Sequence, residues 1–223
     1  ETSLSSSSKL FVIKTPRNRK RDNLVHEALC GLYVTNSVRR MVPNFMYVYG
    51  FSTCSPPVIK DNDVLGSCSS DQNKLSYLVS ENIINSIPMK KFTVYPNITY
   101  HDVCAVLLQV FNALHIAYRE YNYIHFDLHA DNVLVREFES EVAIPFYNIS
   151  GKIEGYIVSR YVPYIIDYGY STFMIDGVLF TRKSGLLESV GIGNPKFPMF
   201  DVYKFLCFSA EAVYVHQKTP ENE

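Results

Sequence analysis

The sequence lacks the features that would direct the chain to a membrane or to nucleic acid. Its 223 residues contain no apolar run long enough to span a bilayer. They also contain no amino-terminal signal peptide. The formal net charge of −1 gives no general attraction to nucleic acid or anionic lipid. We therefore expect an intracellular, cytoplasmic protein that binds neither nucleic acid nor membrane.

Paired cysteines are missing as well. The five cysteines are widely spaced, and no Cys-x-x-Cys motif indicates a zinc site. Their odd number gives no disulfide framework of the kind found in small secreted proteins, which favours a reducing compartment. The one basic run, at 17–21, can contact phosphates or act as a localisation signal, but its short length favours a solvated loop.

The residues that are present suit a folded core. Hydrophobic residues make up 47% of the chain and charged residues 19%, which is typical of globular proteins. The length is enough for one large domain or two small lobes. Apolar and polar patterning predicts strands mainly in the first ninety residues and helices mainly after them. This order predicts two lobes, an amino-terminal one at 1–83 and a carboxyl-terminal one at 84–223.

The individual elements are predicted from periodicity, caps and turn residues. Strands are expected at 9–14, 45–51, 75–79 and 164–166, and helices at 22–39, 100–121 and from 201 to about 215. Asp22 or Asn23 can cap the first helix, and Thr99 with Asp102 forms a variant capping box for the second. Loops are expected at 52–73 and 171–198, and a polar inserted hairpin or loop at 137–160.

One stretch concentrates the polar chemistry. Residues 123–135 read Tyr-Ile-His-Phe-Asp-Leu-His-Ala-Asp-Asn-Val-Leu-Val, with apolar segments at both ends. Two carboxylates, an amide and two imidazoles are costly to hold between buried segments without a function. The spacing His-x-Asp, four residues, Asn matches the catalytic loop of protein kinases at His125, Asp127 and Asn132. A buried strand then delivers Asp167-Tyr168-Gly169.

These motifs resemble a protein-kinase-fold phosphotransferase. Together with Phe200–Leu206, they make the sequence similar to the divergent Ser/Thr protein kinases of large cytoplasmic DNA viruses. The resemblance implies an α+β, two-lobed fold with an antiparallel-sheet amino-terminal lobe and a mainly helical carboxyl-terminal lobe. We expect the first lobe to be truncated before its lysine strand and the second to be incomplete. The resemblance also implies ATP and Mg²⁺ as cofactors, a protein substrate with Ser or Thr, and a location in host cytoplasm or virion.

The resemblance assigns roles to the residues of the two motifs. Asp127 would be the catalytic base, and Asn132 and Asp167 would hold Mg²⁺ and the nucleotide through hard oxygen ligands. His125 and Gly169 would support the loop and the turn. Asp201 would hold the loop backbone, although it can equally act as a helix N-cap.

The amino-terminal lobe would supply the rest of the nucleotide site. Lys14 closes a Phe-Val-Ile-Lys strand and would contact the phosphates, with Glu27 as its ion-pair partner. Ser80 would be the gatekeeper residue, behind which the adenine pocket has room. Backbone groups of Glu81 and Ile83 would bind the adenine.

Several departures from the kinase pattern keep other functions open. Phe126 stands where many regulated kinases have Arg, so we expect no requirement for activation-segment phosphorylation. His129 replaces the usual Lys, as in some sugar or lipopolysaccharide kinases. No Gly-x-Gly-x-x-Gly precedes Lys14, which is consistent with a catalytically weak pseudokinase acting as a binding module. A zinc or iron site at His125-x-Asp127-x-His129 is a further alternative.

Overall fold

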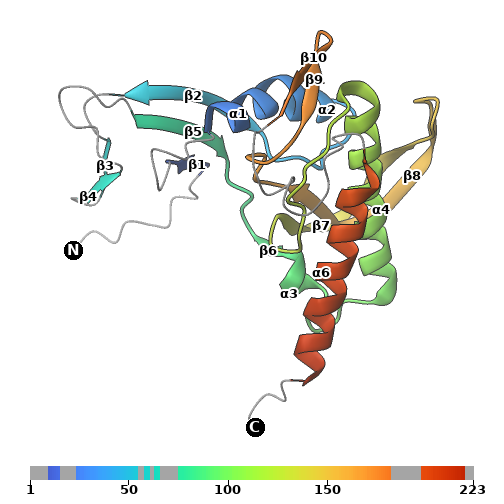
Figure 1. Ribbon diagram of the computed structural model, residues 1–223. Helices are drawn as coiled ribbons and strands as arrows, with labels where there is room; N and C mark the ends of the chain where they lie inside the picture. Colours follow the sequence, from blue (N-terminus) through green and yellow to red (C-terminus); the bar gives the residue numbers. More distant parts are fainter. Residues whose placement is uncertain are drawn as a thin grey trace.

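The computed structural model describes residues 10–15, 24–54, 58–60, 63–65, 75–181 and 197–218 (Figure 1). The basic run at 17–21, the two candidate cap residues Asp22 and Asn23, and Ser184 lie outside these ranges. No helix in the described part of the chain is both long and apolar enough to cross a membrane.

The amino-terminal part contains a three-stranded antiparallel sheet in the order β1-β5-β2. Its strands are β1 (Phe11–Lys14), β2 (Val48–Cys54) and β5 (Leu75–Glu81). β5 runs past the predicted break because Ser80 pairs with Val12 on one side and with Val48 on the other. The prediction of a loop throughout 52–73 was wrong, since β2 extends to Cys54 and a hairpin follows, β3 (Val58–Lys60) with β4 (Asp63–Leu65).

One helical segment lies against this sheet. It consists of α1 (Leu24–Leu29), the π-helix η2 (Cys30–Thr35) and α2 (Asn36–Val38), and it confirms the helix predicted there. The wider π-helical turn was not predicted. It carries Gly31 to the side chain of Val48 on β2, so closely that a Cβ at position 31 would lie 2.7 Å from the Val48 Cβ. This contact fixes the distance between helix and sheet.

The carboxyl-terminal part combines helices with a second sheet. In chain order its elements are β6 (Ser86–Pro88), α3 (Met89–Phe92), α4 (Tyr100–Tyr121), β7 (Val133–Tyr147), β8 (Ile153–Ile165), β9 (Phe173–Ile175), β10 (Val178–Phe180) and α6 (Met199–Lys218). The sheet has the order β6-β7-β8, and β9 pairs with β10. Of the two alternatives predicted for 137–160, a hairpin or a loop, the hairpin is the one observed, with shifts in the antiparallel register between Glu137 and Val142 and between Phe146 and Tyr147. β9 and β10 fall in a segment predicted as loop.

Helix α4 has the predicted bounds. Its capping box is present, because the Asp102 backbone N–H donates to the Thr99 hydroxyl at 3.2 Å and the Thr99 N–H donates to the Asp102 carboxylate at 2.9 Å. The helix ends at Asn122, which adopts a left-handed conformation with φ 48° and turns the chain into residues 123–135. Buried Gln109 and Asn112 hydrogen-bond to backbone of the β7–β8 hairpin, which anchors that hairpin on α4.

The arrangement brings distant segments to one place. β8 ends at Ile165 beside Phe45 of the amino-terminal part, so the chain following β8 reaches the edge of the first sheet. The segment after α4 and the first turn of α6 meet the same region (Figure 1). The predicted lobe boundary at residue 83 falls in the connection between β5 and β6.

Candidate active site

Lys14 joins two carboxylates that come from different parts of the chain. Its Nζ lies 2.8 Å and 3.1 Å from the two carboxylate oxygens of Glu27 on α1, and 2.9 Å from Oδ1 of Asp167 after β8. Glu27 is 1% exposed, whereas Lys14 and Asp167 are 39% and 42% exposed. The predicted Lys14–Glu27 ion pair is therefore present, and its open side faces Asp167.

The charges in this cluster shift the pKa values of Lys14 and Asp167, its two partly exposed members, toward their ionised forms. Burial by itself would lower the pKa of Lys14, but Glu27 and Asp167 outweigh burial and raise that pKa. Burial would raise the pKa of Asp167, but Lys14, assisted by His125 and the Gly169 N–H, lowers it. Burial raises the pKa of Glu27, although Lys14 opposes that change. A lysine cation and the Asp167 carboxylate are thus maintained side by side.

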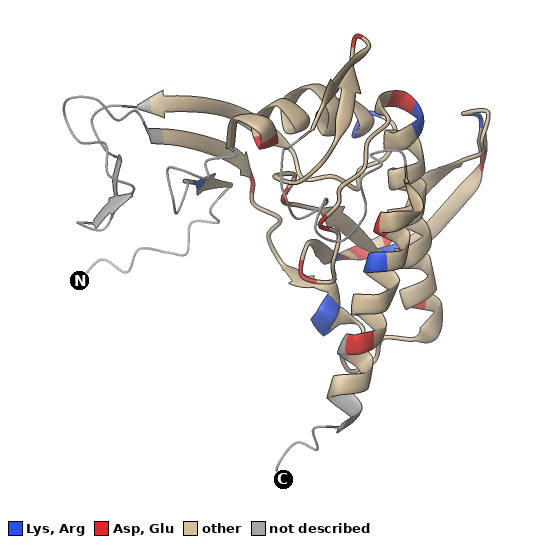
Figure 2. Ribbon diagram, viewed as in Figure 1, with Lys and Arg blue, Asp and Glu red and all other residues tan. Residues whose placement is uncertain are grey.

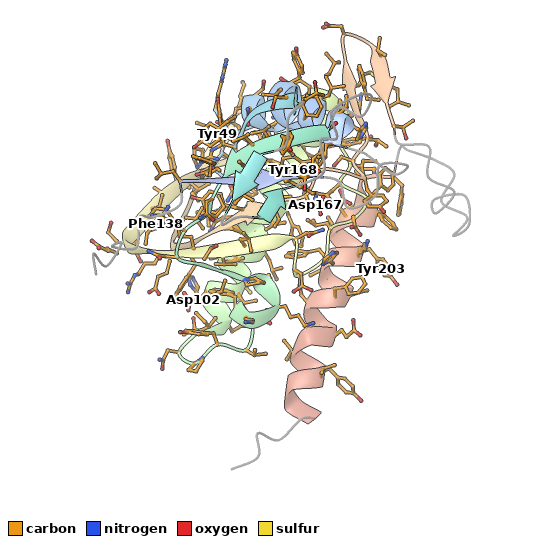
Figure 3. All side chains as sticks on the ribbon, turned by 90° about the vertical axis from the view of Figure 1, so that its left-hand side faces the viewer. Tyr49, Asp102, Phe138, Asp167, Tyr168 and Tyr203 are labelled. Atoms are coloured by element: carbon orange, nitrogen blue, oxygen red, sulfur yellow. The ribbon has the colours of Figure 1, made fainter. Side chains whose placement is uncertain are left out.

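The Asp167 turn is held by its neighbour. Asp167 has φ 65°, which is a strained conformation for a residue with a side chain. The fully buried Tyr168 lies behind it, with its hydroxyl 2.8 Å from the Met46 carbonyl oxygen and 2.9 Å from the Ile165 carbonyl oxygen. Figure 3 labels Asp167 and Tyr168 next to each other. Tyr168 therefore fixes the direction in which Asp167 is presented.

The central loop, residues 125–132, is held from α6. The carboxylate of Asp201 accepts hydrogen bonds from the backbone N–H of His125 at 2.6 Å and of Phe126 at 2.9 Å. Asp201 lies in the first turn of α6 rather than before it, so it serves the loop and not as an N-cap. Burial raises the pKa of Asp201 to about 7. Phe126, with φ 61°, is a second strained position that this contact stabilises.

His125 is used inside the loop. Its Nδ1 accepts from the Asp127 N–H at 3.2 Å, and its Nε2 lies 2.9 Å from the Ile166 carbonyl oxygen. This pattern assigns the neutral tautomer with the proton on Nε2, in agreement with burial lowering the pKa of His125. Both ring nitrogens are engaged, which does not favour the zinc or iron alternative. Within the described ranges, no group of three or more His, Cys, Asp and Glu side chains could hold a metal.

The donor set nevertheless fits Mg²⁺, which needs fewer protein ligands and prefers oxygen. The Asn132 amide nitrogen donates to the Asp127 carbonyl oxygen at 2.9 Å, which leaves the Asn132 amide oxygen as the atom that would bind a cation. The Ile166 N–H donates to the Asn132 carbonyl oxygen at 3.0 Å, so the loop is tied to the segment that carries Asp167. Asn132 and Asp167 are the residues that would hold the ion.

A cavity of about 280 Å³ opens beside this cluster. Its lining includes Lys14, Glu27 and Asp167 at one end and the predicted hinge residues at the other, namely Ser80, Glu81 and Ile83. Ser80 is 4% exposed. The Glu81 N–H donates to the Tyr47 carbonyl oxygen at 2.8 Å, so this N–H is already engaged.

Two residues at the site were missed by the sequence analysis. The carboxylate of Glu81 forms a two-pronged ion pair with Arg39, which fixes the strand end next to the cavity. Lys204 of α6 lies with its Nζ 2.6 Å from Oδ1 of Asp127. The only signal in the sequence was its position three residues after Asp201, which puts both on one face of a helix.

These features define the class. A lysine at a strand end, its glutamate partner on a helix, an Asp-Tyr-Gly turn, and a His-x-Asp loop held by a helix aspartate form an α+β, protein-kinase-like fold. The predicted fold class is therefore confirmed, although its carboxyl-terminal lobe contains more sheet than predicted.

The chain is similar to viral proteins. It is 24% identical over 203 residues to "Probable kinase 098L" of Invertebrate iridescent virus 3, covering 91% of this chain and 34% of that protein. It is 24% identical over 155 residues to "Uncharacterized protein 179R" of Invertebrate iridescent virus 6, covering 66% of this chain and 12% of that protein. The chain thus spans about a third or less of the length of these relatives. The predicted similarity to viral kinases is confirmed.

Other comparisons add little. No protein-family model matches the chain. Among solved structures, it is similar to the Rad53 kinase domain with SCD2, with a TM-score of 0.49 and 15% identity, over 96% of this chain and 61% of that one.

Proposed function

We propose that this chain is the core of an ATP- and Mg²⁺-dependent phosphotransferase, a Ser/Thr protein kinase. The observation that carries the proposal is the bridge made by Lys14 between Glu27 and Asp167, beside a loop that presents Asp127 and Asn132. Phosphoryl transfer asks the protein mainly for placed charges and for orientation of the two reactants. The site contains a cation, two oxygen ligands and a carboxylate for these tasks.

The nucleotide would lie in the cavity between β1, β5 and the Asp167 turn. Ser80, a small residue, leaves room behind the base, and the Glu81 carbonyl and Ile83 backbone would bind the adenine edge. Lys14 is half-exposed toward the cavity, so its Nζ can exchange Asp167 for phosphate oxygens while Glu27 keeps it in place. Bound Mg²⁺ would neutralise charge on the transferring phosphoryl group.

Asp127 would orient the acceptor hydroxyl and take its proton as the oxygen attacks the γ-phosphorus, while the bond from that phosphorus to the β–γ bridging oxygen breaks and ADP leaves. Its backbone N–H is bound to His125 and its carbonyl to Asn132, so the loop geometry that positions it is fixed on both sides. Asp201, through the His125 and Phe126 N–H groups, would hold the loop in this conformation. Asn132 and Asp167 would carry the metal ligation.

The test is transfer of label from [γ-³²P]ATP with Mg²⁺, using dephosphorylated casein as acceptor. We expect Asp127→Ala and Asp167→Ala to lower the transfer rate by about 10²–10⁴-fold, the range that general base and charge-stabilising groups contribute. Asp131→Ala is the matched control, because Asp131 is an exposed aspartate of the same loop.

Other outcomes separate the alternatives. Nucleotide binding without turnover by the wild-type chain would contradict the proposal and favour the pseudokinase. Turnover that is stimulated by a sugar or lipopolysaccharide acceptor but not by casein would keep the phosphotransferase and replace the protein substrate. Equal rates in wild type and both variants would contradict the assigned roles.

A further inference from the structure

The carboxylate of Asp127 has a cationic partner from outside its own loop. Lys204 Nζ lies 2.6 Å from Asp127 Oδ1 and 3.4 Å from the Phe126 carbonyl oxygen. The two side chains are 20% and 32% exposed, so the pair lies at the edge of the site and is open to a reactant. A charge-assisted hydrogen bond of this length restricts the rotation of the carboxylate.

Lys204 reaches the loop because of where it lies on α6. Asp201 and Lys204 are separated by three positions, and Figure 2 shows an acidic segment of this helix followed by a basic one. Residues three apart share one helix face. The fully buried Phe205 anchors the adjoining turn in the core. The first two turns of α6 therefore contact three successive loop residues, His125, Phe126 and Asp127, by two N–H groups, one carbonyl and one carboxylate.

His129 is not the cationic partner of the Asp127 carboxylate. Its Nδ1 accepts from the Asp131 N–H at 3.3 Å, and its ring packs 6.0 Å from the ring of Phe208. Lys204 Nζ lies 5.9 Å from the centre of the same Phe208 ring. The imidazole and the lysine thus flank one aromatic side chain, and it is the lysine that reaches the carboxylate.

We propose that Lys204 is a positioning residue, which holds Oδ1 of Asp127 so that the second carboxylate oxygen is directed at the acceptor hydroxyl. This role rests on the proposed phosphotransferase function. A residue of α6, outside the loop, would then be needed for the full rate of catalysis. Because a partly exposed ion pair contributes little to folding stability, removal of the lysine should lower turnover far more than stability.

The experiment compares steady-state kinetics and thermal unfolding of the full chain, with Mg·ATP and casein. We expect Lys204→Met and Lys204→Gln to lower kcat by about 10–100-fold, the loss that follows misplacement of a reacting group by about 1 Å. The KM for ATP should stay within about twofold, because Lys14 and Asp167 are untouched. Lys204→Arg should restore kcat to within about fivefold of wild type. Lys91→Met, an exposed lysine on α3, is the control.

A double variant tests whether Lys204 acts through Asp127. In an Asp127→Asn background, Lys204→Met should lower kcat by less than about twofold, because groups that act as a unit are not additive. An equal loss in both backgrounds, or a kcat within twofold of wild type for Lys204→Met and Lys204→Gln, would overturn the proposal. A rise in KM for ATP with unchanged kcat would do the same. Absence of turnover in the wild type would instead overturn the phosphotransferase function on which the proposal rests.

Discussion

Gly31→Ala should separate the helix that carries Glu27 from the sheet that carries Lys14. Gly31 lies in the π-helical turn directly after α1, against Val48 of β2, which is completely buried. An added Cβ would lie 2.7 Å from the Val48 Cβ, and one Val48 methyl would be closer still. Rotation of the valine side chain moves its methyl groups but not its Cβ. The backbone itself has to give way.

The size of the effect follows from that distance. Ordinary contact begins at 3.4 Å, so helix and strand must part by at least about 0.7 Å, the difference from 2.7 Å. Overpacking of this kind in a core costs about 1–3 kcal/mol. For a chain of this length about 3 °C of Tm accompanies each kcal/mol, which gives a fall of about 3–9 °C.

The same displacement should lower activity. Glu27 lies one helical turn before Gly31, and its 2.8 Å contact with Lys14 would lengthen beyond hydrogen-bonding range. We expect label transfer from ATP to fall by about tenfold or more, since a 1 Å misplacement can cost up to about 10²-fold. Transfer assays and thermal unfolding on the same preparations measure both effects.

Gly155→Ala is the matched control. A Cβ at position 155 on β8 meets nothing within 4 Å, so this variant should unfold and react as wild type does. If Gly31→Ala matched Gly155→Ala in both Tm and rate, the close contact between helix and sheet would not be what sets the Lys14–Glu27 distance.

Three further predictions concern the cavity, pH and regulation. Ser80→Phe should fill the rear of the cavity and weaken bulky adenine-site inhibitors by about tenfold or more in binding titrations; unchanged affinity would refute the gatekeeper assignment. Burial raises the pKa of Asp201 from 3.8 to about 7, so the folded chain holds a proton that the unfolded chain releases between these values. The free energy of unfolding should thus fall as pH rises from about 4 to about 7, and the Tm of wild type minus that of Asp201→Asn should be larger at pH 5 than at pH 8; a constant difference would contradict this. Phosphatase-treated protein should keep full activity, because Phe126 offers no cation for a phosphate and Ser171 and Thr172 are fully buried; activation only after phosphorylation at Ser171, Thr172, Thr181 or Ser184 would contradict it.

Local signals were enough for some parts of this structure. Helix α4 was predictable because the Thr99–Asp102 capping box begins it and a continuous apolar face extends to Tyr121. The spacing of His125, Asp127 and Asn132 was informative because these residues act within one loop. In both cases the interactions that define the feature span only a few residues.

Other parts depend on contacts between distant residues. Asp127 and Lys204 are 77 positions apart, and no local pattern indicates that α6 crosses the loop at that point. The polar sequence at 137–160 left a hairpin and a loop open, because the hairpin depends on cross-strand pairing and on hydrogen bonds from Gln109 and Asn112 of α4. The same holds for the Arg39–Glu81 pair, which joins α2's end to β5.

The most direct test of the account is a titration of the chain with ATP in the presence and absence of Mg²⁺. We predict binding that Mg²⁺ strengthens in wild type and in Asp127→Asn, while Asp167→Ala and Asn132→Ala lose the Mg²⁺ dependence. Asp127→Asn should then bind nucleotide as wild type does but transfer phosphate about 10²–10⁴-fold more slowly. Affinity that is independent of Mg²⁺ in wild type, or equally weak binding in Asp127→Asn and Asp167→Ala, would contradict the separation of metal ligands from base on which the account depends.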